Sequence, residues 1–275
     1  MSLANRYYKL LSGYSESPSA DARALLAYVI KEGDPLLIWR DLTQAEEAQM
    51  LSLIEKRKTG IPIAYLTGEK EFMGIPFYVN EHTLIPRPDT ETIVETIIEE
   101  NPFEKPLITD LCTGTGCIGI SLAHFIKDAT VTLWDISPYA VEVAEKNILR
   151  HNLSDRVTVQ QGDVLKDNYP LSDIIVSNPP YIADHIADTL EVSRFEPHLA
   201  LKGGTDGLDF YRAMIPKAFL SLNEGGMLAF EIGYDQGIAV QELMEEYFTN
   251  VKIKKDYADN DRMVYGYKSL ELSEK

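Results

Sequence analysis

The sequence has few cysteines, a deficit of basic residues and no long hydrophobic run. Only Cys112 and Cys117 occur in 275 residues, which is too few for a disulfide framework, and their spacing fits no zinc-binding pattern. No apolar run is long enough to span a bilayer, and residues 1–10 lack the hydrophobic region of a signal peptide. We therefore expect a cytoplasmic protein with reduced thiols, no membrane association and no metal site.

The charge balance is strongly acidic. There are 43 Asp and Glu residues against 26 Lys and Arg, which gives a formal net charge of −17. Proteins that coat nucleic acid need clustered basic side chains for phosphate contacts. The composition therefore disfavours a nucleic acid partner, although a local basic patch stays compatible with it. At 45% hydrophobic residues, the chain is long enough for one large domain or two smaller ones.

The N-terminal part, residues 1–60, reads as a small helical domain. Its two amphipathic stretches, 20–31 and 43–58, repeat apolar residues at helical spacing. Thr43 followed three positions later by Glu46 is a capping-box signature, so the second helix is expected to begin there.

Glycine and proline mark the ends of the next segments. Residues 32–35 end the first helix, and residues 61–89 combine several prolines with short β-prone pieces such as 77–79. We read 61–89 as a β-hairpin linker. A second, larger domain then covers residues 90–275, starting with a helix over 90–100.

From residue 106 onward, strand and helix patterns alternate. The predicted strands are 107–111, 130–134, 157–161, 173–177, 226–232, 251–256 and 263–268. The predicted helices are 118–125, 139–151, 209–222 and 236–247. Such alternation is typical of an α/β fold with a doubly wound, Rossmann-like, mostly parallel sheet, here of seven strands. Because no helix separates the last two strands, they are expected to form an antiparallel hairpin at the C-terminal edge.

A glycine-rich segment joins the first of these strands to a helix. It reads Asp110, Leu111, Cys112, Thr113, Gly114, Thr115, Gly116. Glycines there let the backbone approach a ligand closely, and the free N–H groups at the helix start face that ligand. The spacing also satisfies the dinucleotide fingerprint, which alone is a weak signal.

Acidic residues follow the next two strands. Asp135, about 20 residues after the glycines, is placed to accept two hydrogen bonds from a ribose diol. It can also serve as a helix cap, but Ser137 is available for that task. Asp163 can accept a hydrogen bond from an adenine amino group, with Ile136 and Val164 offering apolar faces on either side.

The fourth strand ends in Asn178-Pro179-Pro180-Tyr181. Proline lacks an N–H donor, so the strand stops at the carboxyl edge of the sheet, where open α/β folds bind ligands. The Asn178 carboxamide oxygen and the Pro179 carbonyl are both acceptors. Together they can hold a planar –NH₂ group by its two hydrogens, which indicates chemistry on an amino or amide nitrogen.

In this order, the motifs resemble those of class I S-adenosylmethionine-dependent methyltransferases that modify amino groups. Within that class, segments 84–91, 195–197 and 256–262 resemble one family more closely. Over nearly its whole length, the chain is similar to the release-factor glutamine methyltransferases (the PrmC/HemK family). Two positions differ from the family pattern. Cys112 stands where the family more often has glycine, and Val164 where some relatives have an aromatic residue.

The resemblance implies a methyl donor, an acceptor and a set of site residues. The donor is S-adenosylmethionine, which leaves as S-adenosylhomocysteine, and the acceptor is the glutamine of the Gly-Gly-Gln loop of class I peptide release factors. Asn178 and Pro179 are expected to orient the acceptor amide, and Tyr181 to pack against the glutamine side chain and shape the slot. Pro180 is expected to belong to the same substrate-binding loop. The N-terminal domain is expected to recognise the partner. The expected cofactor contacts are Cys112, Thr113, Gly114, Thr115, Gly116, Asp135, Ile136, Asp163, Val164 and Asn178.

Three alternatives stay open on the residues alone. A nucleic-acid methyltransferase acting on adenine N6 or guanine N2 has the same kind of loop but needs basic surface. An NAD-dependent oxidoreductase fits the glycines and Asp135 but leaves the loop unexplained. A non-catalytic nucleotide-binding module has no need of Asn178. For Arg87 and Glu91, the sequence allows two roles: stabilising the domain junction or shaping the substrate cleft.

Overall fold

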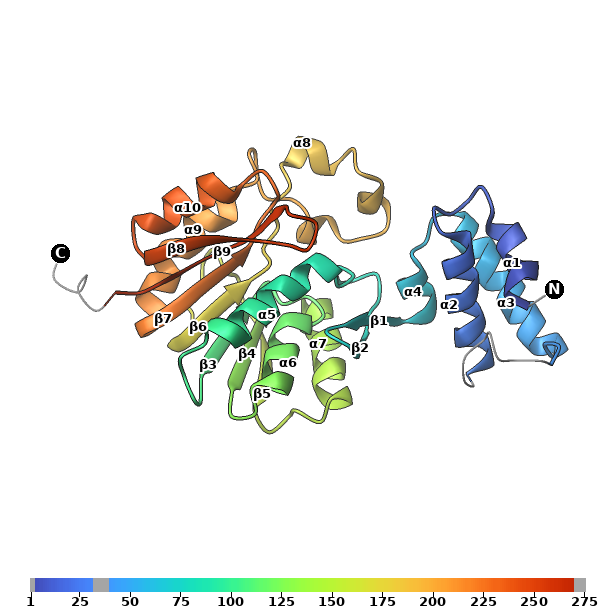
Figure 1. Ribbon diagram of the computed structural model, residues 1–275, viewed down its shortest axis with the longest axis horizontal. Coiled ribbons are helices and arrows are strands. Elements are labelled where there is room, and N and C mark those ends of the chain that lie inside the picture. Colours follow the sequence, from blue (N-terminus) through green and yellow to red (C-terminus); the bar gives the residue numbers. More distant parts are fainter. Residues whose placement is uncertain (1–2, 32–39, 270–275) are drawn as a thin grey trace. The chain divides into compact units, whose positions relative to one another are not determined.

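A computed structural model describes residues 3–31 and 40–269 of the chain (Figure 1). The helix end expected at residues 32–35 lies outside these ranges. The chain divides into two compact units between Glu69 and Lys70, and each unit is built around hydrophobic clusters of its own. We describe the two units separately.

The N-terminal unit is helical. Its helices are α1 (Leu3–Leu11), α2 (Pro18–Ile30), α3 (Gln44–Lys58) and α4 (Ile63–Thr67). The capping box predicted for α3 is confirmed: the Thr43 hydroxyl accepts from the Glu46 N–H at 3.3 Å, and the Glu46 carboxylate accepts from the Thr43 N–H at 2.8 Å. Apolar side chains from α1, α2 and α3 meet in its core.

Helix α4 was not expected, because the sequence pattern assigned residues 61–89 to a hairpin linker. Pro62 precedes this helix, and Gly68 ends it in a left-handed conformation with φ of +71°. Ile63 and Leu66 pack against the N-terminal core. Five residues are too few for a helical period to show in the sequence, so packing on neighbouring helices decides the conformation. The expected hairpin follows as β1 (Glu69–Phe72) and β2 (Ile75–Tyr78).

The second unit contains the predicted seven-stranded sheet. Its strands are β3 (Leu107–Leu111), β4 (Thr130–Asp135), β5 (Val157–Gln161), β6 (Ser172–Ser177), β7 (Leu222–Glu231), β8 (Thr249–Lys255) and β9 (Asp261–Tyr267). Their order across the sheet is β5-β4-β3-β6-β7-β9-β8. β3 to β7 pair in parallel, whereas β9 pairs antiparallel with both β7 and β8, as predicted for the C-terminal hairpin.

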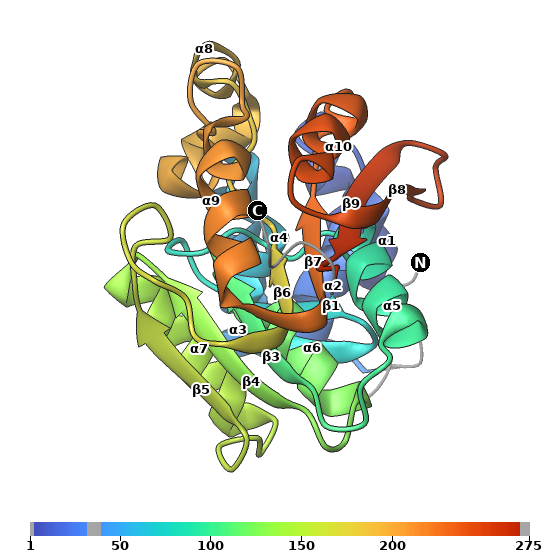
Figure 2. The ribbon, with the colours of Figure 1, turned by 90° about the vertical axis from the view of Figure 1, so that its left-hand side faces the viewer.

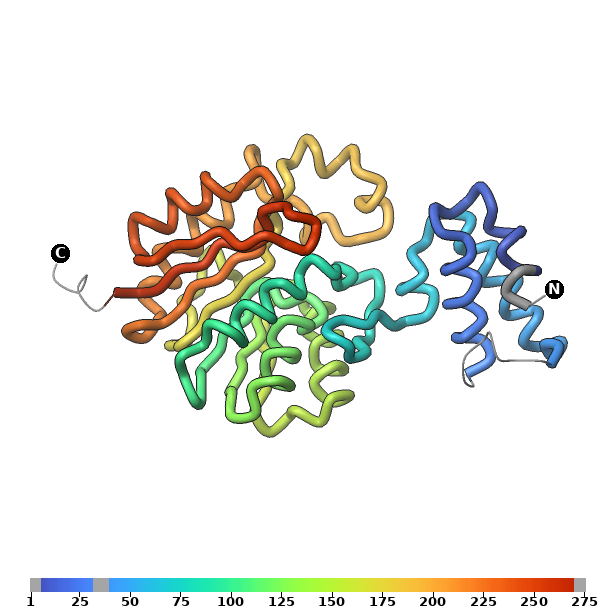
Figure 3. Tube along the Cα trace, in the orientation of Figure 1, coloured from blue at the N-terminus to red at the C-terminus, as the bar shows by residue number. Residues whose placement is uncertain are grey.

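Helices cover both faces of this sheet, as a doubly wound fold requires (Figure 2). One face packs against α5 (Glu91–Glu100), α6 (Cys117–Phe125) and α7 (Pro138–Arg150). The other packs against α9 (Asp209–Ser221) and α10 (Gly237–Glu245). A long excursion between β6 and α9 holds the short helices α8 (Asp184–Ala187), η3 (Glu191–Arg194) and η4 (His198–Ala200), and its path can be followed in Figure 3.

The strand order positions the site. The chain runs from β3 outward through β4 to β5, and then returns to β6 on the other side of β3. Consequently Leu111 and Ser177, the last residues of β3 and β6, are register partners. The glycine-rich segment and the Asn-Pro-Pro-Tyr loop therefore leave the sheet side by side, at the switch point where open α/β folds bind ligands.

Candidate active site

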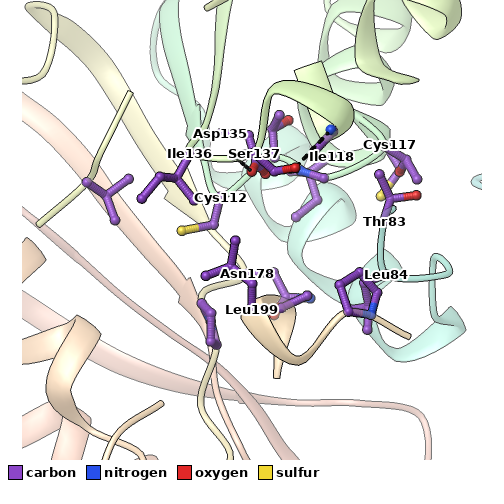
Figure 4. Close-up of a pocket in the computed structure, with 18 of the residues that line it drawn as sticks. Thr83, Leu84, Cys112, Cys117, Ile118, Asp135, Ile136, Ser137, Asn178 and Leu199 are labelled. Atoms are coloured by element: carbon purple, nitrogen blue, oxygen red, sulfur yellow. Dashed lines mark hydrogen bonds between the residues drawn. The ribbon is translucent and has the colours of Figure 1, made fainter. Parts of the chain in front are cut away.

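A pocket opens at this switch point, on the carboxyl edge of the sheet (Figure 4). Most of its lining comes from the loops that follow β3, β4, β5 and β6. Two further segments contribute: 82–90, which precedes the sheet, and 197–200, which lies in the excursion between β6 and α9. The contributing stretches are 82–90, 112–118, 135–140, 162–165, 178–180, 197–200 and Phe210. In Figure 4, Asn178 lies close to Cys112 and Leu199.

Most of the residues singled out from the sequence lie along this pocket. They are Cys112, Thr113, Gly114, Thr115, Asp135, Ile136, Asp163, Val164, Asn178 and Pro180. Gly116, Pro179 and Tyr181 do not line it. Gly116 is the N-cap of α6, Pro179 is buried beside the pocket, and Tyr181 packs against the apolar cluster on the α9 and α10 face.

The Asp110 carboxylate holds the glycine-rich segment in place through hydrogen bonds. One of its carboxylate oxygens accepts from the Thr113 hydroxyl at 2.5 Å and from the Gly119 N–H at 3.0 Å. Its other oxygen is buried and has no partner among the described residues. Burial raises the pKa of Asp110 to about 7, against the two hydrogen bonds that lower it. Gly114 and Gly116 turn the segment with φ of +55° and +81°.

Cys112 also has a positive φ, of +59°, which side chains other than glycine rarely adopt. The backbone there needs the conformation for which glycine is suited. The thiol is free, and burial followed by the nearby charge of Asp135 raises its pKa well above the usual range. A thiol with a raised pKa is a poor nucleophile, so Cys112 serves this pocket as a small apolar wall.

Asp135 is fixed at the end of β4 by two backbone donors. One oxygen accepts from the Gly114 N–H at 2.8 Å and the other from the Ser137 N–H at 2.9 Å. Ser137, rather than Asp135, caps helix α7 by accepting from the Ala140 N–H. Burial raises the pKa of Asp135 despite these bonds. Each oxygen keeps acceptor capacity, so the carboxylate can receive two further donors from a ligand.

Asp163 is engaged more locally than the sequence suggests. Its carboxylate accepts from the Leu165 N–H at 2.9 Å and pairs with Lys166 at 2.8 Å, and the lysine lowers its pKa. Asp163 still lines the pocket, as do the apolar residues Ile136 and Val164. It therefore combines a turn-forming role with a place in the pocket lining.

Asn178 follows a strand end that is held tightly. The Ser177 hydroxyl donates to the Leu111 carbonyl at 2.6 Å, which ties β6 to β3 just before the loop. The Asn178 carboxamide lines the pocket, and no residue in the described part of the chain hydrogen-bonds to it. A partly buried amide with unused hydrogen-bonding capacity is ready to bind a ligand.

Two segments far apart in sequence cover the pocket, and an ion pair joins them. An Arg87 nitrogen lies 2.5 Å from one oxygen of Glu196, while the other oxygen accepts from the Ile85 N–H at 3.0 Å. The Glu196 side chain is only 3% exposed. Arg87 thus shapes the cleft. Glu91 instead accepts from the Met73 N–H at 2.8 Å and holds the β1–β2 turn to helix α5.

Several lining residues were not predicted from the sequence to belong to the site. They are His82, Thr83, Leu84, Pro86, Thr90, Leu165, Leu199 and Phe210. The run Ile85-Pro86-Arg87-Pro88 is a sequence feature that indicates this part of the site, because its prolines restrict the backbone and a rigid segment can form one wall of a pocket. Nothing in the sequence pattern places Leu199 or Phe210 at the pocket.

Comparison with known proteins identifies the family. Residues 88–195 match the methyltransferase small domain, and residues 3–68 match the PrmC N-terminal domain. The release factor glutamine methyltransferase of Moorella thermoacetica is 41% identical over 271 residues, 96% of each chain. That of Clostridium acetobutylicum is 40% identical over 274 residues, 95% of each chain. This chain belongs to the release factor glutamine methyltransferase family. The resemblance read from the motifs is therefore confirmed.

Solved structures agree on the fold of this family member. A methyltransferase from Pyrococcus furiosus is 20% identical and superposes with a TM-score of 0.54, over 81% of this chain and 100% of that one. Within residues 3–31 and 40–269, no helix is long and apolar enough to cross a membrane. The same residues contain no group of three or more His, Cys, Asp or Glu side chains placed to hold a metal ion.

Proposed function

We propose that this protein transfers a methyl group from S-adenosylmethionine to the side-chain amide nitrogen of a glutamine in class I peptide release factors. The acceptor is the glutamine of the Gly-Gly-Gln loop, and the products are N5-methylglutamine and S-adenosylhomocysteine. Family membership supports the reaction, and the pocket supports the site. We place the reaction in the cytoplasm, where release factors act.

The residues present fit the proposed donor. Gly114 has a positive φ and a Cβ there would meet no atom within 4 Å, so the backbone of the glycine-rich segment is open to a ligand at this point of the pocket. Asp135 offers two fixed oxygens to a ribose diol. Ile136 and Val164 offer apolar surface to an adenine ring, and Asp163 offers an acceptor for its amino group.

Asn178 and Pro179 would prepare the acceptor. An amide nitrogen is a poor nucleophile because its lone pair is delocalised into the carbonyl, whereas the bound sulfonium supplies an activated methyl group. The Asn178 oxygen and the Pro179 carbonyl would accept the two amide hydrogens, which orients the nitrogen and stabilises its developing positive charge. As the N–C bond forms, the S–C bond breaks and its electron pair stays on sulfur. The methylated nitrogen then loses a proton to solvent.

One observation carries this assignment. The Asn178 carboxamide lines the pocket without a hydrogen-bond partner in the described chain, although Ser177 just before it is locked to β3. An asparagine kept for structure is expected to bond its own loop. An amide held rigidly but left open is what an incoming –NH₂ group requires.

The variant Asn178→Ala tests the assignment. We expect kcat to fall by about 10²- to 10³-fold, as for loss of one preorganised hydrogen-bonding group, while the Kd for S-adenosylmethionine stays within about threefold. Methyl transfer to release factor and isothermal titration calorimetry measure the two quantities. Asn223→Ala is the matched control, because Asn223 bonds Asp173 at the opposite edge of the sheet. Undiminished turnover in Asn178→Ala would rule the role out.

We also propose that the N-terminal helical unit recognises the release factor. Two observations support this: residues 3–68 match the PrmC N-terminal domain, and the whole pocket lining falls within residues 82–210. A protein beginning at residue 70 is expected to bind S-adenosylmethionine with a Kd within about threefold of the full chain, but to lose at least about tenfold in kcat/KM for release factor. An unchanged kcat/KM contradicts the proposal.

A further inference from the structure

Two side chains, at the end of β7 and in the turn that follows it, reach the loop that carries the acceptor site. Glu231 is the last residue of β7, Gln236 lies in the turn before α10, and neither lines the pocket. We propose that Glu231 and Gln236 are positioning residues, which fix Tyr181 from its two ends and thereby set the acceptor slot. The inference rests on the proposed function of Asn178 and Pro179.

The hydroxyl end of Tyr181 is held by Glu231. The hydroxyl donates to one carboxylate oxygen of Glu231 at 3.3 Å. Glu231 is only 2% exposed, and the Tyr211 hydroxyl donates to its backbone carbonyl at 2.8 Å. A buried carboxylate anchored in this way presents a fixed acceptor, so the ring of Tyr181 has one preferred position.

The backbone end of Tyr181 is held by Gln236. The side-chain nitrogen of Gln236 donates to the Tyr181 carbonyl at 3.0 Å and to the Gly207 carbonyl at 3.3 Å, and its oxygen accepts from the Gly233 N–H at 2.9 Å. The amide therefore uses both donor hydrogens and an acceptor site. Gly207 has φ of +79°, and a Cβ there would lie 2.3 Å from the Tyr181 carbonyl, so this close approach requires glycine.

Fixing Tyr181 also fixes the acceptor atoms, because the residues between them are stiff. Pro179 and Pro180 each have a locked φ, so a shift of Tyr181 passes along the chain to the Pro179 carbonyl. A displacement of about 1 Å at a reacting group can lower the rate by about 10²-fold. Glu231 and Gln236 would thus influence turnover without touching either substrate.

A double-mutant cycle in the full-length protein tests the hydroxyl end. We expect Tyr181→Phe and Glu231→Leu each to lower kcat by about tenfold, and the double variant to lose about tenfold rather than a hundredfold, because both changes remove one shared contact. Glu231→Gln keeps an acceptor and is expected to restore kcat to within about threefold of wild type. Single-turnover methylation of release factor gives the rates, and calorimetry should give an unchanged Kd for S-adenosylmethionine.

Two further variants complete the design. Gln236→Ala tests the backbone end and is expected to lower kcat by about tenfold with an unchanged cofactor Kd, whether or not Glu231→Leu folds. Tyr267→Phe is the matched control, because its hydroxyl bonds the Glu100 carboxylate at 3.1 Å. Tyr267 ends β9, whereas the register partner of Glu231, Met263, lies near the start of that strand. The control variant should leave kcat unchanged.

Several outcomes would overturn the inference. The first is that the losses of kcat in Tyr181→Phe and Glu231→Leu multiply in the double variant. The second is full activity in Gln236→Ala, and the third is a loss of affinity for S-adenosylmethionine as large as the loss of kcat. If wild-type protein methylates release factor but the variants behave like it, only the positioning role is wrong. If wild-type protein does not methylate release factor at all, the proposed function is wrong, and this inference falls with it.

Discussion

Cys112 has a backbone conformation that costs free energy for any residue with a Cβ. Its φ of +59° lies in the left-handed region, where the penalty is about 1–2 kcal/mol. Its side chain packs against the apolar cluster of the α9 and α10 face and lines the pocket. The sequence resemblance noted glycine as the commoner family residue here, and the positive φ gives the physical reason.

Substitutions at Cys112 should separate backbone strain from packing. For Cys112→Gly we expect the free energy of unfolding to stay within about 1 kcal/mol of wild type, because relief of strain offsets lost contacts and a more flexible unfolded chain. Cys112→Val should cost about 2 kcal/mol or more, since a β-branched residue is especially strained at positive φ. Urea denaturation measures both. A valine variant as stable as wild type would disprove the strain argument.

At the level of elements, the sequence predicted the sheet but not the segments that cover the pocket. All seven strands and the antiparallel edge hairpin follow from periodicity, and the Asn-Pro-Pro-Tyr loop and Asp135 follow from strand ends, where the local pattern is informative. The segments over the pocket meet through Arg87 and Glu196, which are 109 positions apart. Such contacts depend on tertiary packing that a local pattern does not encode. Helix α4 was missed for the same reason.

The ion pair between these two segments should control cofactor affinity. In Arg87→Met, the buried Glu196 carboxylate loses its counter-charge, which is costly in a desolvated site. We expect the Kd for S-adenosylmethionine to rise by about tenfold or more and segment 195–200 to become sensitive to protease. Calorimetry and limited proteolysis provide the measurements.

Arg212→Met is the control for this prediction. Arg212 pairs with Asp206, and both side chains are about half exposed, so solvent screens the pair and its loss should change little. If Arg87→Met, like Arg212→Met, gave the same Kd for S-adenosylmethionine as wild type, the contact between Arg87 and Glu196 would have no role in cofactor affinity.

Over the whole molecule, buried acids and net charge set the pH dependence of stability. Burial raises the pKa of both Asp110 and Glu231 to about 7, from ordinary values of 3.8 and 4.5. Between those values the folded state holds protons that the unfolded state has lost, so stability falls as pH rises through this window. The net charge of −17 adds repulsion between like charges, which also lowers stability as pH rises.

The ligand-free protein should therefore unfold at lower urea concentration at pH 8 than at pH 5.5. In the variant carrying both Asp110→Asn and Glu231→Gln, this difference should shrink, and the remainder should weaken with added salt because it arises from surface charge. Glu46 and Asp206 have pKa values lowered to about 2, so the stability they contribute is lost only in more acidic solution, below their ordinary values. Greater stability at pH 8 would contradict the account.

The most direct test of the central claim is mass spectrometry of a release factor incubated with this protein and S-adenosylmethionine. The account predicts a mass increase of one methyl group, located by peptide fragmentation on the glutamine of the Gly-Gly-Gln loop, and its absence when Asn178→Ala replaces the wild-type protein. An unmodified release factor, or a methyl group on any other residue, would contradict it.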